Sequence, residues 1–182
     1  MKKSWMTRIS ILLLLSLSIF QLTSCHPTGV GAYMENPVVS NLPKQNRELL
    51  LYIEKSGIQV IKQGMRFTFV IPTDCFFEKD TRRLKSHRYY DLDKLAQFIR
   101  EYTDYFQHPH ISIAGYTDKT WFAPARDKLS RHYANIIAGV LVEDGVDPGM
   151  MHVKGAGAKH PIASNHYPMG TAFNRRVEIV IH

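Results

Sequence analysis

Ile111-Ser112-Ile113-Ala114-Gly115-Tyr116-Thr117-Asp118 is the stretch of the chain that best indicates its fold. The apolar and β-branched residues up to Gly115 predict a strand, and the polar pair Thr117-Asp118 follows it closely. Residues 124–143 then predict a long helix, which ends at Gly145 because glycine readily adopts the backbone of a helix C-terminus. A strand, a polar turn and a long helix therefore follow one another.

The rest of the chain adds two strands before this stretch and two after it. Residues 58–61 and 66–71 are β-rich runs, and Lys62-Gln63-Gly64-Met65 between them predicts a hairpin turn. We also expect helices over 48–55 and 90–106, strands from Val153 and over 176–181, and one long loop over 157–173. The order β-β-α-β-α-β-β, with two helices on one sheet face, predicts an α+β sandwich of two layers.

Residues 1–24 have the parts of a secretory signal peptide: basic residues near the start, an apolar run over 9–20, and small residues before a cleavage site. Leu22-Thr23-Ser24-Cys25 resembles the lipobox of bacterial lipoproteins, which implies that Cys25 carries palmitate-type acyl chains as the mature N-terminus. The alternative is a cleaved soluble protein in which Cys25 stands by chance. His26, rather than an aspartate, follows the cysteine, so we expect the outer membrane.

Residues 25–46 are rich in Pro, Gly, Asn and Ser and predict a flexible tether to a folded domain over 47–182. Residues 1–24 hold three positive charges and no negative ones, so their removal lowers the formal charge from +7 to +4. No Lys/Arg stripe interleaved with aromatic residues occurs, so the charge does not indicate nucleic-acid binding. With Cys25 acylated, we expect Cys75 to be a buried small side chain without an internal disulfide.

Three segments resemble the family of OmpA-like C-terminal domains. They are Gly115-Tyr116-Thr117-Asp118, the segment from Leu129-Ser130 to Gly145-Val146, and the segment from Gly155 to Asn174-Arg175-Arg176-Val177-Glu178-Ile179. The resemblance covers about residues 55–182 and implies a periplasmic domain that holds peptidoglycan. The chain has no Gly-x-Ser-x-Gly element, no histidine near Cys75 and no paired metal-ligand spacing, so we expect neither an enzyme nor a metal or cofactor site.

In that family, the aspartate of a Thr-Asp pair binds the ammonium of diaminopimelate in the peptidoglycan stem peptide, and a helix arginine binds a carboxylate. Thr117 and Asp118 match the pair. The arginine is missing, because the family pattern Leu-Ser-x-x-Arg-Ala reads Leu129-Ser130-Arg131-His132-Tyr133-Ala134 here, with Tyr133 at its position. Three further departures are Arg126 for an asparagine, Trp121 for a glycine and Thr171 for an arginine.

Helix geometry offers a replacement for the missing arginine. Arg126, Ser130 and Tyr133 are spaced i, i+4 and i+7, so they share one helical face from which Arg126 could reach the ligand. The alternative is a pocket that no longer binds, in which Arg126 is a solvated charge and Asp118 caps a turn. Arg175 and Arg176 alternate in a strand, and one of the two is expected to pair with an acidic group near the pocket.

A narrower resemblance is to the DotK (IcmN) lipoprotein family of Dot/Icm type IVB secretion systems. The residues that carry it are Gly57-Ile58-Gln59-Val60-Ile61, Ile71-Pro72-Thr73-Asp74 and Phe76-Phe77. It implies a structural subunit with two attachments, to outer-membrane lipid through Cys25 and to peptidoglycan through the domain. The alternative is a subunit whose domain has lost its peptidoglycan site and contacts other secretion-complex subunits.

Overall fold

A computed structural model describes residues 42–79, 81–120 and 122–182. The predicted signal peptide, Cys25, most of the predicted tether and Trp121 lie outside the described residues. Within the part that the structure describes, no helix is both long enough and apolar enough to cross a membrane.

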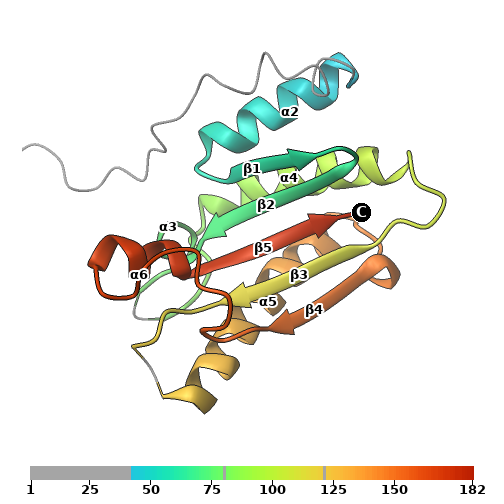
Figure 1. Cartoon of the computed structure of the whole chain (residues 1–182). Coiled ribbons are helices and arrows are strands. Elements are labelled where there is room, and N and C mark those ends of the chain that lie inside the picture. The colour runs from blue at the N-terminus through green and yellow to red at the C-terminus, as the bar shows by residue number, and fades with distance from the viewer. Residues whose placement is uncertain (1–41, 80, 121) are drawn as a thin grey trace, which may run out of the picture.

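The described residues form one mixed sheet of five strands (Figure 1). They are β1 (Gln59–Gln63), β2 (Arg66–Pro72), β3 (Ile111–Tyr116), β4 (Met151–Gly155) and β5 (Arg176–Ile181). The spatial order is β1-β2-β5-β3-β4, in which β3 and β4 are parallel and the other neighbours antiparallel. The predicted succession of strands is confirmed, and the last strand lies at the centre of the sheet.

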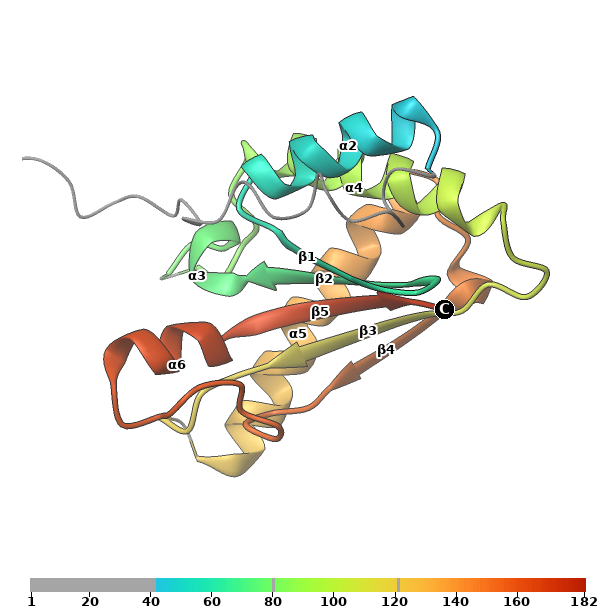
Figure 2. The same cartoon turned by 45° about the horizontal axis from the view of Figure 1, so that its top comes forward.

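Two long helices cover one face of this sheet (Figures 1 and 2). α4 (Arg88–Thr103) precedes β3, and α5 (Ala123–Glu143) connects β3 to the parallel β4. α2 (Lys44–Lys55) packs alongside α4, as Figure 2 shows. The predicted two-layer α+β architecture is therefore confirmed.

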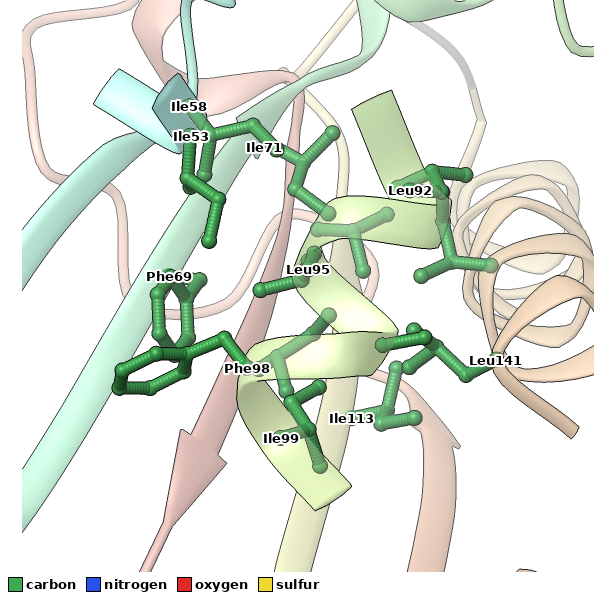
Figure 3. Close-up of a cluster of buried hydrophobic side chains, with 14 of the residues drawn as sticks. Ile53, Ile58, Phe69, Ile71, Leu92, Leu95, Phe98, Ile99, Ile113 and Leu141 are labelled. Carbon is green, nitrogen blue, oxygen red and sulfur yellow. The ribbon is translucent and has the colours of Figure 1, made fainter. Parts of the chain in front are cut away.

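The hydrophobic core lies between the sheet and these helices. Val177, Ile179 and Ile181 alternate along β5 and are fully buried, as the two-residue period of a strand requires. Phe98 of α4 meets Phe69 of β2 there, with ring centroids 5.5 Å apart (Figure 3). This continuous core fixes the helices relative to the strand ends that carry the polar residues.

Two glycines allow α5 to lie directly on the sheet. A Cβ on Gly115 of β3 would lie 1.9 Å from the carbonyl oxygen of Ser130 in α5. A Cβ on Gly155 of β4 would lie 2.6 Å from the carbonyl oxygen of Asp127. Both contacts are with helix backbone, so the N-terminal half of α5 is held close to the point where Thr117-Asp118 begins.

Three helical segments differ from the prediction. α2 begins at Lys44 and Leu42 belongs to the core, so folded structure starts inside the segment predicted as a tether. α3 (Thr73–Phe76) and α6 (Pro168–Asn174) are additional helices, and α6 lies within the predicted loop over 157–173. α6 exposes both Met169 and Phe173, so it lacks the buried apolar stripe by which a helix is found in a sequence.

Cys75 also differs from the prediction, in its bonding. Its side chain is half-buried and packs against the core, close to the burial that its apolar neighbours indicate. It is disulfide-bonded, and its partner lies outside the described residues. The expectation that the chain has no disulfide is therefore wrong for this structure.

Candidate functional site

A cavity of about 770 Å³ opens at the end of the sheet where β3 gives way to Thr117-Asp118. It lies between the α3 segment, the end of β3 and the middle of α5, all of which can be followed in Figure 1. The lining residues are Thr73, Asp74, Phe77, Glu78, Lys79, Arg82, Tyr116, Thr117, Asp118, Leu129, Tyr133 and Arg175. The structure thus brings the predicted residues Thr117, Asp118 and Tyr133 together.

Asp118 is the deepest charged group of this cavity, with only 2% of its surface exposed. The backbone N–H of Thr120 donates to its Oδ1 over 3.0 Å, the Thr120 hydroxyl donates to the same oxygen, and Arg175 Nη1 donates to Oδ2 over 2.5 Å. Burial alone would raise the pKa of the Asp118 carboxyl, but the hydrogen bonds from Thr120 and Arg175 outweigh it and hold the pKa below its usual value. Asp118 is therefore a carboxylate at neutral pH.

Arg175 joins Asp118 to a second carboxylate. Its Nε donates to Asp74 Oδ1 over 2.9 Å, and its Nη2 donates to Asp74 Oδ2 over 2.5 Å. The hydrogen bonds from Arg175 to Asp74 raise the pKa of the guanidinium above its usual value. One cation thus lies between two carboxylates, so these three side chains together carry one net negative charge.

The choice between the two arginines of the Asn-Arg-Arg segment is settled by these contacts. Arg175 is the one that pairs with acidic groups in the cavity. Arg176 is buried away from the cavity, where its Nε donates to Glu178 over 2.7 Å and its guanidinium stacks on the ring of Tyr116. Arg176 therefore pairs with Glu178 and Tyr116 and not with the carboxylates of the cavity.

Thr117 contributes an unused polar atom to the cavity. Its backbone N–H donates to the carbonyl oxygen of Gly157 over 2.8 Å, which fixes its position. Its hydroxyl is buried and has no hydrogen-bond partner among the described residues. A buried hydroxyl without a partner is costly, so this atom is suited to a ligand that enters the cavity.

Tyr133 forms an aromatic wall of the cavity. Its ring centroid lies 4.5 Å from that of Phe77, and the two rings are tilted by 53°. Burial raises the pKa of the Tyr133 phenol, so the group is neutral and can donate one hydrogen bond. It stands where the family pattern has a cation, and it cannot supply the charge.

The other predicted site residues lie outside the cavity. Arg126 is at the start of α5, where its Nη1 is 3.4 Å from the carbonyl oxygen of Lys119, and it does not line the cavity. Ser130 is fully buried, donates to Asp127 O over 3.0 Å and accepts from the N–H of Gly157 over 3.0 Å. Thr171 donates to Pro168 O within α6. The structure thus gives Ser130 a role in holding the loop after β4, and gives the Arg126 replacement no support.

Asp74 and Arg82 are among the cavity residues that were not predicted as site residues. Asp74 can be assigned to the cavity only when the strand pairing is known. β2 and β5 are antiparallel, with Pro72 opposite Arg176. That register places the residues after β2 beside those before β5, and the Thr73 N–H indeed donates to Arg175 O over 3.0 Å. Arg82 belongs to the loop after α3, where sequence alone shows only a charged, exposed segment.

The chain matches one protein family over more than half of its length. The OmpA family model matches residues 76–175, and the chain belongs to the OmpA family. One relative is the probable lipoprotein YiaD of Escherichia coli, which is 30% identical over 153 residues, covering 84% of this chain and 64% of YiaD. Another is the peptidoglycan-binding protein ArfA of Mycobacterium tuberculosis, 37% identical over 106 residues, covering 58% of this chain and 31% of ArfA. The chain spans less than two thirds of the length of either relative.

A similar solved structure is the cell wall anchor of the T6SS from Pseudomonas aeruginosa. It superposes with a TM-score of 0.64 at 25% identity, and the match covers 76% of this chain and 96% of that one. The domain of this chain therefore has the overall fold of that anchor.

Proposed function

We propose that this chain is an outer-membrane lipoprotein that holds peptidoglycan in the cavity around Asp118. The observation that carries the proposal is the buried Asp118 carboxylate in one cavity with the Thr117 hydroxyl, which has no hydrogen-bond partner among the described residues. The names of two relatives support it, one a peptidoglycan-binding protein and one a cell wall anchor. The residues present offer binding groups rather than a nucleophile with its base, so a binding role suits them better than catalysis.

The diaminopimelate residue of a peptidoglycan stem peptide fits the chemistry of this end of the cavity. Its ammonium would lie against Asp118 and Asp74, two carboxylates that share the single guanidinium of Arg175. The Thr117 hydroxyl can accept a hydrogen bond from the same ammonium. Binding would thus give the ammonium two carboxylates and the Thr117 hydroxyl a hydrogen-bond partner.

Asp118→Asn is expected to weaken peptidoglycan binding by about tenfold to a hundredfold, because an amide is isosteric but cannot neutralise an ammonium. Full-length protein in mild detergent would be co-sedimented with purified peptidoglycan over a range of protein concentrations. Asp104→Asn, an exposed aspartate after α4, is the matched control and should bind like the wild type. Unchanged binding by Asp118→Asn, with the fold intact by circular dichroism, would contradict the proposed site.

The membrane attachment is the second part of the proposal. Cys25→Ser should abolish acylation and move the protein from the membrane fraction to the soluble periplasmic fraction, because a single thiol carries the acyl chains. Radiolabelled palmitate incorporation and membrane sedimentation measure the two effects, and Cys75→Ser serves as the control that keeps both. A Cys25→Ser protein that still incorporates palmitate and sediments with membranes would show that the anchor lies elsewhere. The chain has two cysteines, so a Cys25 that carries acyl chains cannot also be the disulfide partner of Cys75. Mass spectrometry without reductant distinguishes the two forms, and a disulfide at Cys25 would overturn the proposed anchor.

A second candidate function is that of a protein-interaction subunit of a type IVB secretion complex. It is favoured by four large apolar side chains that the segment around α6 exposes, namely Ile162, Tyr167, Met169 and Phe173. Such exposure on one short segment is typical of a protein contact. If the complex forms with Asp118→Asn but not with a Met169→Ser/Phe173→Ser variant, the chain would serve as a structural subunit irrespective of peptidoglycan.

A further inference from the structure

Two histidines are paired at the end of the sheet that lies away from the cavity. His110 comes directly before β3, and His182 comes directly after β5. The N–H of His110 donates to His182 O over 2.9 Å, and the N–H of His182 donates to His110 O over 3.0 Å. Residues that exchange both backbone hydrogen bonds are a directly opposed antiparallel pair. The two histidines therefore extend the β3–β5 ladder by one position, near the label C in Figure 1.

The side chains of this pair share the face of the sheet that α4 and α5 do not cover. The adjacent pair in the ladder, Ile111 and Ile181, is fully buried in the core beneath the helices. Side chains alternate between the two faces along a strand, so His110 and His182 both point to the other face, where both are exposed. Their ring centroids are 5.0 Å apart, and the ring planes are inclined by 68°. The backbone pairing thus holds two imidazoles side by side at the surface.

The separation of the two rings suits one transition-metal ion between them. An imidazole nitrogen binds Zn²⁺ at about 2.0–2.1 Å, which puts the ion roughly 3.2 Å from the ring centroid. Two imidazoles on one ion, with an angle of about 90–110° between them, then have centroids about 4.5–5.2 Å apart. The observed separation of 5.0 Å lies within this range. His110 and His182 can therefore bind one ion without moving the strands apart.

The two imidazoles select the kind of ion. Imidazole suits Cu²⁺, Ni²⁺ and Zn²⁺, whereas Mg²⁺ and Ca²⁺ need oxygen ligands. Among the residues that the structure describes, no group of three or more His, Cys, Asp or Glu side chains is placed to hold an ion. The ion would therefore have two protein ligands, and water would complete its coordination. Two imidazoles bind one ion more tightly than a single imidazole does, because the second is already held beside the first.

Arg66 is the charged residue next to this pair. Phe67 of β2 lies opposite Ile181, so Arg66, the residue before Phe67, falls beside His182 on the same face. The pKa of the His182 imidazole is lowered first by partial burial, then by His110 and by the positive charge of Arg66. A guanidinium repels a divalent cation, so Arg66 lowers the affinity of the pair for an ion.

We propose that His110 and His182 together bind one divalent transition-metal ion, Cu²⁺ most tightly, and that the ion joins the start of β3 to the end of β5. Neither histidine lines the cavity, so the site is separate from the proposed peptidoglycan site and does not depend on it. The sequence predicted no metal site because only the β3–β5 register brings the two histidines together. β5 is the central strand of the sheet, so an ion bound at this pair stabilises the folded domain.

The test is a calorimetric titration of the full-length protein in mild detergent, at about pH 7.5, where ordinary imidazoles are neutral. The ions are Cu²⁺ and Zn²⁺, with Mg²⁺ as the negative control. His110→Gln and His182→Gln each remove one imidazole and keep the backbone hydrogen bonds. The matched control is His152→Gln, an exposed histidine of β4 that lies opposite Ser112 of β3. Arg66→Gln removes the adjacent positive charge.

His110→Gln and His182→Gln should each weaken Cu²⁺ binding by about tenfold or more, while His152→Gln should stay within about twofold of the wild type. Arg66→Gln should bind Cu²⁺ up to about tenfold more tightly. Zn²⁺ should raise the melting temperature of the wild type and of His152→Gln, but not that of His110→Gln. Equal affinity of the wild type and both single variants of the pair, or an equal loss in His152→Gln, would overturn the inference, because the ion would then bind elsewhere. Neither result bears on the proposed peptidoglycan binding.

Discussion

Arg175→Met is expected to lower the free energy of unfolding by about 3 kcal/mol, at the lower end of the cost of breaking a buried ion pair. The guanidinium is the cation that contacts both Asp118 and Asp74, and Asp118 is almost completely buried. Without it, two carboxylates lie close together with no compensating charge. Methionine keeps much of the volume of the side chain, so the loss reports on charge rather than on packing.

Urea unfolding followed by circular dichroism measures this loss for Arg175→Met. Arg83→Met, an exposed arginine on the α3–α4 loop, is the matched control and should stay within about 0.5 kcal/mol of the wild type. Adding Asp118→Asn to Arg175→Met should recover part of the lost stability, because the buried carboxylate is then gone. A stability of Arg175→Met equal to that of the wild type would mean that the Asp74–Arg175–Asp118 contacts add nothing to the fold.

The loss of unfolding free energy in Arg175→Met should become smaller in acid. The folded-state pKa of Asp118 is held below its usual value, so its contribution is fully present above the unfolded pKa of about 3.9 and is lost as the pH falls through the lower folded pKa. In Arg175→Met the cation is absent, and burial should make Asp118 take up a proton at higher pH. The stability difference between the two proteins should therefore begin to narrow above about pH 4, where Asp118 of the variant takes up its proton, and should keep narrowing as the pH falls through the lower folded pKa of wild-type Asp118.

The sheet could be predicted from the sequence because each strand shows its period locally. Ile111–Tyr116 is a short apolar run bounded by polar residues, and Arg176–Ile181 alternates buried and half-buried positions. Thr117 and Asp118 follow from their place after that strand. α6 was not predicted, because a seven-residue helix that exposes its apolar residues shows no helical period in the sequence.

The rest of the cavity depends on contacts that no local pattern contains. Asp74 and Arg175 meet only because β2 and β5 are neighbours in the sheet, although the two residues are 101 positions apart. Ser130 was predicted to face the ligand from its helical spacing, but the spacing does not reveal that the loop at Gly157 covers it. Arg82 lies on an exposed loop, where a charged residue by itself indicates only solvent contact.

Gly115→Ala is expected to destabilise the domain by at least about 3 kcal/mol, the upper range for an overpacked core. The added Cβ would lie 1.9 Å from the carbonyl oxygen of Ser130, and neither β3 nor α5 can move without disturbing the core between them. The strain also acts on the cavity, because α5 carries Tyr133 and β3 leads directly to Thr117-Asp118. We therefore expect weakened peptidoglycan co-sedimentation together with the loss of stability.

Gly139→Ala is the matched control, since it makes the same substitution in the same packed pair of elements. A Cβ on Gly139 of α5 meets no atom within 4 Å, and alanine is the better helix former by up to about 1 kcal/mol. Thermal unfolding should therefore show a higher melting temperature for Gly139→Ala and a much lower one for Gly115→Ala. If Gly115→Ala unfolded at the wild-type temperature and still bound peptidoglycan, α5 could lie farther from β3 than the structure shows, and the close approach would not be what positions Tyr133 at the cavity.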